Sequence, residues 1–188
     1  MQAPCERIAE LKELAKKGSS GDSASQQQVA ARLAQGFENE GDPLIRAEIV
    51  RTLGAYRCQQ AEDVLRAALE DLDPEVRMTA CEAWGKRDGP QSAALLGRTL
   101  GGDVDIDVRL AAARALGRSK DPSAVAALGE VLGDEDPAMQ VRAMKSLRQI
   151  TGKDLGNDVN RWQQYVGGET PEPARSLSIA ERLRQMFY

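Results

Sequence analysis

The chain has 188 residues, of which 41% are hydrophobic and 29% charged, a balance that fits one soluble globular domain. Its net charge of −4 argues against a general nucleic-acid binder, because such a protein needs a basic surface to neutralise phosphates. The sequence shows no signal peptide and no apolar run long enough to span a membrane, so we expect a cytoplasmic protein, or an envelope-associated one if the N-terminus is truncated.

The first predicted unit covers residues 4–39 and contains two helices. The first helix, at about 4–17, has apolar residues at helical spacing. The second, at about 24–39, places Val29, Leu33 and Phe37 on one face. This unit diverges from those that follow, as is typical of the end of a repeat array, where one unit must cover the open core.

A cassette then recurs four times, beginning at residues 42, 73, 105 and 136. The copies are DPLIRAEIVRTLG, DPEVRMTACEAWG, DIDVRLAAARALG and DPAMQVRAMKSLR, with a period of 31 or 32 residues. Such a period indicates a solenoid, in which no single unit buries its own apolar face. The aspartate that opens each cassette is a good N-cap, and the proline that usually follows suits a first helical turn.

Each cassette helix is followed by a second apolar helix, which completes a helix pair. Aligned leucines of these second helices form two core columns, one of Leu65, Leu96 and Leu128 and one of Leu69, Leu100 and Leu132. The predicted units are 4–39, 42–72, 73–102, 105–133 and 136–166. The predicted fold is therefore all-α, a right-handed α-α superhelix of about five helix pairs plus a C-terminal helix.

The C-terminal region departs from the repeat. Residues 167–175 are rich in Gly, Pro and Glu and are expected to form an extended linker. Residues 176–188 are expected to form an amphipathic helix. We favour a helix that caps the array, and the alternative is a motif that binds the groove of a partner.

The cassettes resemble HEAT repeats of the short bacterial type, the phycobiliprotein-lyase-like HEAT repeats. The segments DIDVRLAAARALG (105–117) and DPSAVAALGEVL (121–132) carry this resemblance most clearly, and it extends well over residues 42–151 and weakly over 4–41. It implies an armadillo-like solenoid whose surface binds other proteins. HEAT-repeat hydroxylases that hold iron through His-Glu pairs are a poor match, because this chain has no histidine.

Acid–arginine pairs at i, i+4 spacing stand in three of the cassettes. The resemblance implies that these residues form a structural ladder between successive units, and the five donors of Arg suit carboxylates or carbonyls of a neighbouring unit. A site repeated in this way is better interpreted as a structural link than as an active site. The predicted ladder residues are Asp42, Arg46, Asp73, Arg77, Asp105 and Arg109.

The exposed side of the second helices is the predicted partner-binding face, and we expect it to line the concave surface of the superhelix. Its candidate residues are Glu62, Asp63, Arg66, Glu70, Arg98 and Glu130. The function predicted from these features is a non-enzymatic scaffold or adaptor for a protein partner, with no nucleic acid and no membrane segment involved. The alternative is a bilin-lyase-like protein or another HEAT protein that handles a small ligand.

The composition predicts neither a catalytic site nor a cofactor or metal site. Without histidine, the chain lacks the commonest general base and the commonest metal ligand. Its three cysteines, Cys5, Cys58 and Cys81, do not form a paired disulfide pattern. Cys81 aligns with Ala113 and is expected to be a small core residue, whereas Cys58 lies in a predicted turn and is expected to be more accessible.

Overall fold

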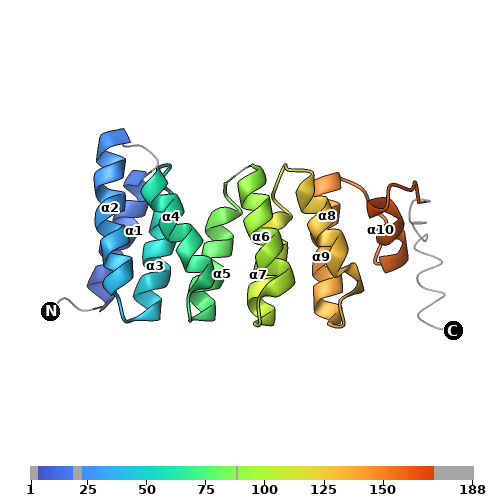
Figure 1. Ribbon diagram of the computed structural model, residues 1–188, viewed down its shortest axis with the longest axis horizontal. Coiled ribbons are helices and arrows are strands. Elements are labelled where there is room, and N and C mark those ends of the chain that lie inside the picture. The colour runs from blue at the N-terminus through green and yellow to red at the C-terminus, as the bar shows by residue number, and fades with distance from the viewer. Residues whose placement is uncertain (1–3, 19–22, 88, 172–188) are drawn as a thin grey trace, which may run out of the picture.

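The computed structural model describes residues 4–18, 23–87 and 89–171, and within these ranges it contains α-helices and short 3-10 turns but no strand. The predicted all-α solenoid is confirmed (Figure 1). The elements are α1 (Pro4–Gly18), α2 (Ser23–Asn39), α3 (Pro43–Leu53), α4 (Gln59–Ala67), η1 (Ala68–Glu70), α5 (Pro74–Trp84), α6 (Pro90–Gly102), α7 (Ile106–Leu116), α8 (Ser123–Glu130), η2 (Val131–Gly133), α9 (Pro137–Thr151) and α10 (Val159–Val166).

The cassette helices begin where the repeat places an aspartate. Asp42, Asp73 and Asp136 each accept a hydrogen bond from the backbone N–H two residues later, and Asp105 does the same at the start of α7. These carboxylates satisfy amide groups that have no partner inside the helix, and their charge is favourable at a helix N-terminus.

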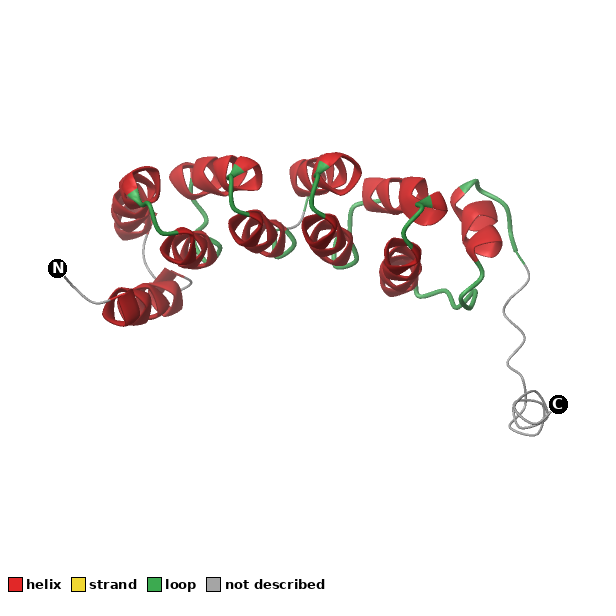
Figure 2. Cartoon of the chain, turned by 90° about the horizontal axis from the view of Figure 1, so that it is seen from below, coloured by secondary structure: helices red, strands yellow, loops and turns green. Residues whose placement is uncertain are grey.

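The helices form two layers, with α1, α3, α5, α7 and α9 in one layer and the even-numbered helices in the other (Figure 2). Figure 2 shows the array of helices as a shallow arch whose inner side is the odd-numbered layer. The prediction that the second helices of the units line the concave surface is therefore wrong. Those second helices are α2, α4, α6, α8 and α10, and they lie on the outer side of the arch.

Small residues explain why the odd-numbered helices approach one another so closely. A Cβ atom added to Gly85, at the end of α5, would lie 2.8 Å from Cβ of Ala115 in α7. One added to Gly117 would lie 2.9 Å from Cβ of Ser146 in α9. Because these helices meet at Gly, Ala and Ser, their layer is compact, and the outer layer has the longer path around the bend.

The core runs between the two layers along the array. Trp84 and Trp162 are its largest fully buried side chains, and each donates its indole N–H to a backbone carbonyl, of Leu65 and of Gly156 respectively. Trp162 belongs to α10 and closes the last described unit. Tyr165 packs edge-on against it, with ring centroids 6.1 Å apart. The predicted helix at 176–188, and residues 172–175 of the predicted linker, lie outside the described residues.

The three cysteines lie in different environments, and all are free thiols. Cys5 is exposed, Cys58 is half-buried and Cys81 is buried in the core. Burial, with a smaller effect from the charge of Asp103, raises the pKa of the Cys81 thiol to about 12. None of the helices in the described ranges has both the length and the apolar character that a membrane span requires.

Candidate functional site

The arginines of the predicted ladder link consecutive inter-unit turns. Arg46 donates Nε and Nη2 to the two carboxylate oxygens of Asp71, at 2.9 and 2.8 Å. Its third nitrogen, Nη1, donates to the carbonyls of Glu40 and Gly41 in the preceding turn, at 3.2 and 3.1 Å. One guanidinium therefore joins the turn before α3 to the turn before α5, with all three nitrogens engaged.

The next unit repeats this contact, and the unit after it has a variant of it. Arg77 binds Asp103 side-on and also reaches the carbonyls of Asp71 and Leu72. Arg109 binds Asp134 through Nη2 and the carbonyl of Leu100 through Nε. The result is a continuous row of cross-links along one edge of the array.

The aspartates predicted as ladder partners occupy a different place. Asp42, Asp73 and Asp105 cap their own helices, and the arginines pair instead with carboxylates two residues upstream of a cap. Asp71, Asp103 and Asp134, which hold this role, were missed from the sequence. The sequence pattern that could have identified them is Asp-x-Asp, in which the second Asp is the helix cap. Each upstream carboxylate also accepts the backbone N–H of that cap residue.

The row of cross-links has a different pair of residues at each end. Arg7 of α1 pairs with Glu40, which also accepts the N–H of Asp42 and so takes the place of an upstream aspartate. At the other end Gln140 donates to the carbonyl of Asp134 at 2.7 Å. Burial raises the pKa of the Asp71 carboxyl, but hydrogen bonds from Arg46 and from the N–H of Asp73 outweigh it, so the net pKa is lowered.

A groove of about 640 Å³ lies between α2 and α4, and we call it the acidic groove. Its apolar floor and rim are formed by Ala34, Phe37, Val64, Ala67 and Leu72. Its acidic lining residues are Glu38, Glu40, Asp63, Glu70 and Asp71, and Arg46 and Gln60 complete the walls. It opens on the outer, even-numbered side of the array, because both of its helices belong to that layer.

A second groove of about 330 Å³ lies between η1 and α6. It is more polar and has both charge signs, since it is lined by Arg66, Glu70, Arg98 and Asp103 with Leu69 and Leu95 beneath. Glu70 borders both grooves, so the two are neighbours on the same face.

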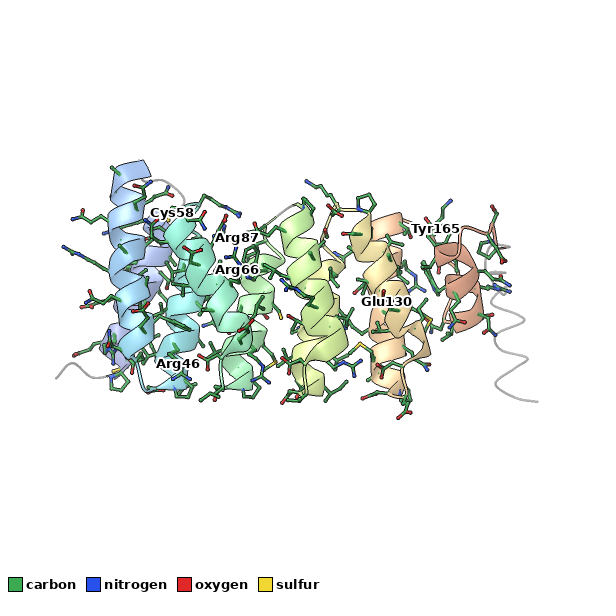
Figure 3. The ribbon with its side chains drawn as sticks, viewed as in Figure 1. Arg46, Cys58, Arg66, Arg87, Glu130 and Tyr165 are labelled. Carbon is green, nitrogen blue, oxygen red and sulfur yellow. The ribbon has the colours of Figure 1, made fainter. Side chains whose placement is uncertain are left out.

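Four of the six predicted face residues line these grooves. Asp63 and Glu70 line the acidic groove, and Arg66, Glu70 and Arg98 line the second groove. Figure 3 shows Arg66 on α4 and Glu130 well apart from it on α8. Glu130 lines neither groove, although it is exposed.

Glu62, another predicted face residue, lines neither groove and takes part in a contact between units. It accepts a hydrogen bond from Arg87 at 3.0 Å, and Arg87 is buried against Trp84, with its guanidinium carbon 5.7 Å from the ring centroid. Arg87 also donates to the carbonyl of Tyr56, so this cluster ties one unit to the next. Burial and the nearby Arg57 lower the pKa of Arg87.

The chain belongs to the HEAT-repeat family. A sequence model of HEAT repeats matches residues 30–107 and 99–158, which together cover more than half of the chain. The predicted family resemblance is therefore confirmed. Among curated proteins, no relative matches the sequence.

A solved structure with a similar fold is that of human deoxyhypusine hydroxylase in complex with glycerol. The two chains are 21% identical with a TM-score of 0.58, and the match covers 66% of this chain and 44% of the hydroxylase. The chain thus corresponds to less than half of the hydroxylase's length. This similarity contradicts the prediction that the protein is not an enzyme, because the fold on which the prediction rested also occurs in an enzyme.

Proposed function

We propose that this HEAT-repeat protein binds a protein partner through the outer face of its even-numbered helices. The observation that carries the proposal is the pair of adjacent grooves on that face. They are lined by apolar side chains and flanked by the charged residues Asp63, Arg66, Glu70 and Arg98. An apolar floor with a polar rim is the usual anatomy of an interface.

The inner face is less suited to binding a partner. Its helices meet at Gly, Ala and Ser, and neither groove is lined by an α5, α7 or α9 residue. The arginine row is also unsuited to partner binding, because the donors of Arg46 and Arg77 are already satisfied within the chain. This supports the placement of recognition between the even-numbered helices.

Site-specific photo-crosslinking in an extract of the source cells tests this proposal. A photoreactive residue at position 70, on the rim of both grooves, is expected to capture a discrete partner, and one at exposed position 114 on α7 is expected not to. Two charge-reversal variants identify which groove contributes to the capture: Arg98→Glu in the second groove and Glu38→Lys in the acidic groove. Capture from position 114 alone, or from neither position, would contradict the proposal.

A further inference from the structure

We infer that the acidic groove binds a cationic peptide segment of the partner, one that inserts an apolar side chain between α2 and α4 and is flanked by Lys or Arg. This inference rests on the proposed partner-binding role of the outer face and names the chemistry that the face selects. It follows from the shape of the groove, from its charge and from its one aromatic wall residue.

The groove is large enough for several side chains. Its volume of about 640 Å³ lies within the usual range of ligand pockets, about 300–1,000 Å³. Phe37 from α2 and Val64 from α4 provide apolar surface on opposite walls, and Leu72 at the rim is 96% exposed. An aromatic side chain that is only half-buried in a groove is typical of the anchor positions of interfaces.

The charge of the groove selects a cation. Glu40 and Asp71 have their charge compensated within the chain by Arg7 and Arg46. Glu38 on the α2 side and Glu70 on the η1 side are exposed carboxylates of the rim, and neither forms an ion pair with another residue in the described part of the chain. Asp63 has a weak ion pair, since Arg66 lies 3.6 Å away.

No basic group of the groove is available to an anionic ligand. Arg46 is the only basic side chain among its lining residues, and both edges of its guanidinium are occupied by Asp71 and by the carbonyls of the turn before α3. A ligand with Lys or Arg beside an apolar side chain would therefore satisfy the carboxylates and cover the floor at once. Phe37 adds an aromatic face that favours a nearby cation.

The test uses the full-length protein and fluorescein-labelled peptide pools of about a dozen residues. Each pool has a central Leu or Phe, flanked in one pool by Lys and Arg and in the matched pool by Glu and Asp. Fluorescence anisotropy is expected to show binding of the cationic pool about tenfold tighter than that of the acidic pool. Added salt is expected to weaken the difference, since the Debye length shortens to about 3 Å at 1 M.

Two variants locate the binding. Ala67→Trp fills the groove from an exposed position of α4, and Glu38→Lys reverses a rim charge. Each is expected to weaken binding of the cationic pool about tenfold. Ala126→Trp and Glu130→Lys make the same changes at exposed positions of α8 outside both grooves, and they are expected to leave binding unchanged.

The possible outcomes separate this inference from the proposed function. The inference is overturned if the two pools bind equally well. It is also overturned if Ala67→Trp and Glu38→Lys leave binding of the cationic pool unchanged. If crosslinking from position 70 still captures a partner in that case, and Arg98→Glu abolishes the capture, the outer face remains the binding surface and the second groove is its centre. Failure of the crosslinking itself overturns the proposed function.

Discussion

Arg77 donates Nε and Nη2 to the two carboxylate oxygens of Asp103, at 2.8 and 2.9 Å, although the residues are 26 positions apart in the sequence. The two side chains are only 12% and 7% exposed. A side-on pair of this kind, largely removed from water, is held much more firmly than a surface ion pair. It fixes the spacing of two successive turns and so the register of the repeat.

Loss of this guanidinium is expected to destabilise the array. Arg77→Ala leaves the largely buried Asp103 carboxylate without its cation, and the free energy of unfolding should fall by about 2–3 kcal/mol. Urea denaturation followed by circular dichroism measures the change. Arg66→Ala is the matched control, because its pair with Asp63 is exposed and 3.6 Å long, and it should cost less than about 0.5 kcal/mol.

Acid should weaken the same row of cross-links. Hydrogen bonds from Arg46 and from the N–H of Asp73 outweigh the effect of burial and leave the native pKa of Asp71 below its ordinary value of 3.8. The N–H of Asp136 and the guanidinium of Arg109 likewise lower the pKa of Asp134. A lowered native pKa means that the stabilisation is complete above the unfolded-state pKa and is lost as the pH falls through the native pKa.

Asp71→Asn provides the check on this pH dependence. At neutral pH the variant should be less stable than the wild type. The difference should shrink as the pH falls below about 4, because the unfolded wild-type chain then binds a proton at Asp71 while the native carboxylate, whose pKa is lower, still resists protonation. Urea unfolding at a series of pH values measures it. A difference that stays constant down to about pH 2 would show that the carboxylate charge at position 71 does not contribute.

The close approach of α5 and α7 makes Gly85 sensitive to a single methyl group. A Cβ atom there would lie 2.8 Å from Cβ and 3.0 Å from Cα of Ala115, so the two helices must move apart. Gly85→Ala should therefore lower the free energy of unfolding by about 1–3 kcal/mol. Gly101→Ala in α6 is the control, because its added methyl meets no atom within 4 Å. It should be neutral or stabilise by up to about 1 kcal/mol.

The three cysteines should differ in their reactivity toward maleimide. The thiolate is the reactive form, and burial holds the pKa of Cys81 at about 12, so the native protein should label at exposed Cys5, more slowly at half-buried Cys58, and not at Cys81. Mass spectrometry after maleimide treatment counts the labelled thiols. Cys81→Ala should leave the native count unchanged and lower the count in denaturant by one. Labelling of Cys81 in the folded protein as fast as of Cys5 would refute its placement in the core.

Much of this fold follows from features that are local in the sequence. The cassette at 73–85 carries its cap at Asp73, its proline at 74 and its helix end at Gly85, and the structure places α5 between them. Such signals act within a few residues, so they can be recognised without knowledge of the tertiary fold. The core residues Trp84 and Leu96 likewise follow from helical periodicity.

The sequence by itself determined the repeat, its helix caps and the apolar columns, because each depends on the period or on neighbours within one helical turn. Only the tertiary structure decided that Arg77 meets Asp103 and not a cap aspartate, and that the odd-numbered helices lie inside the bend. It also decided that Glu70 borders two grooves while Glu130 borders none. These outcomes depend on how closely helices of different units approach, and that distance is set by side chains about 30 residues apart, beyond the reach of any local pattern.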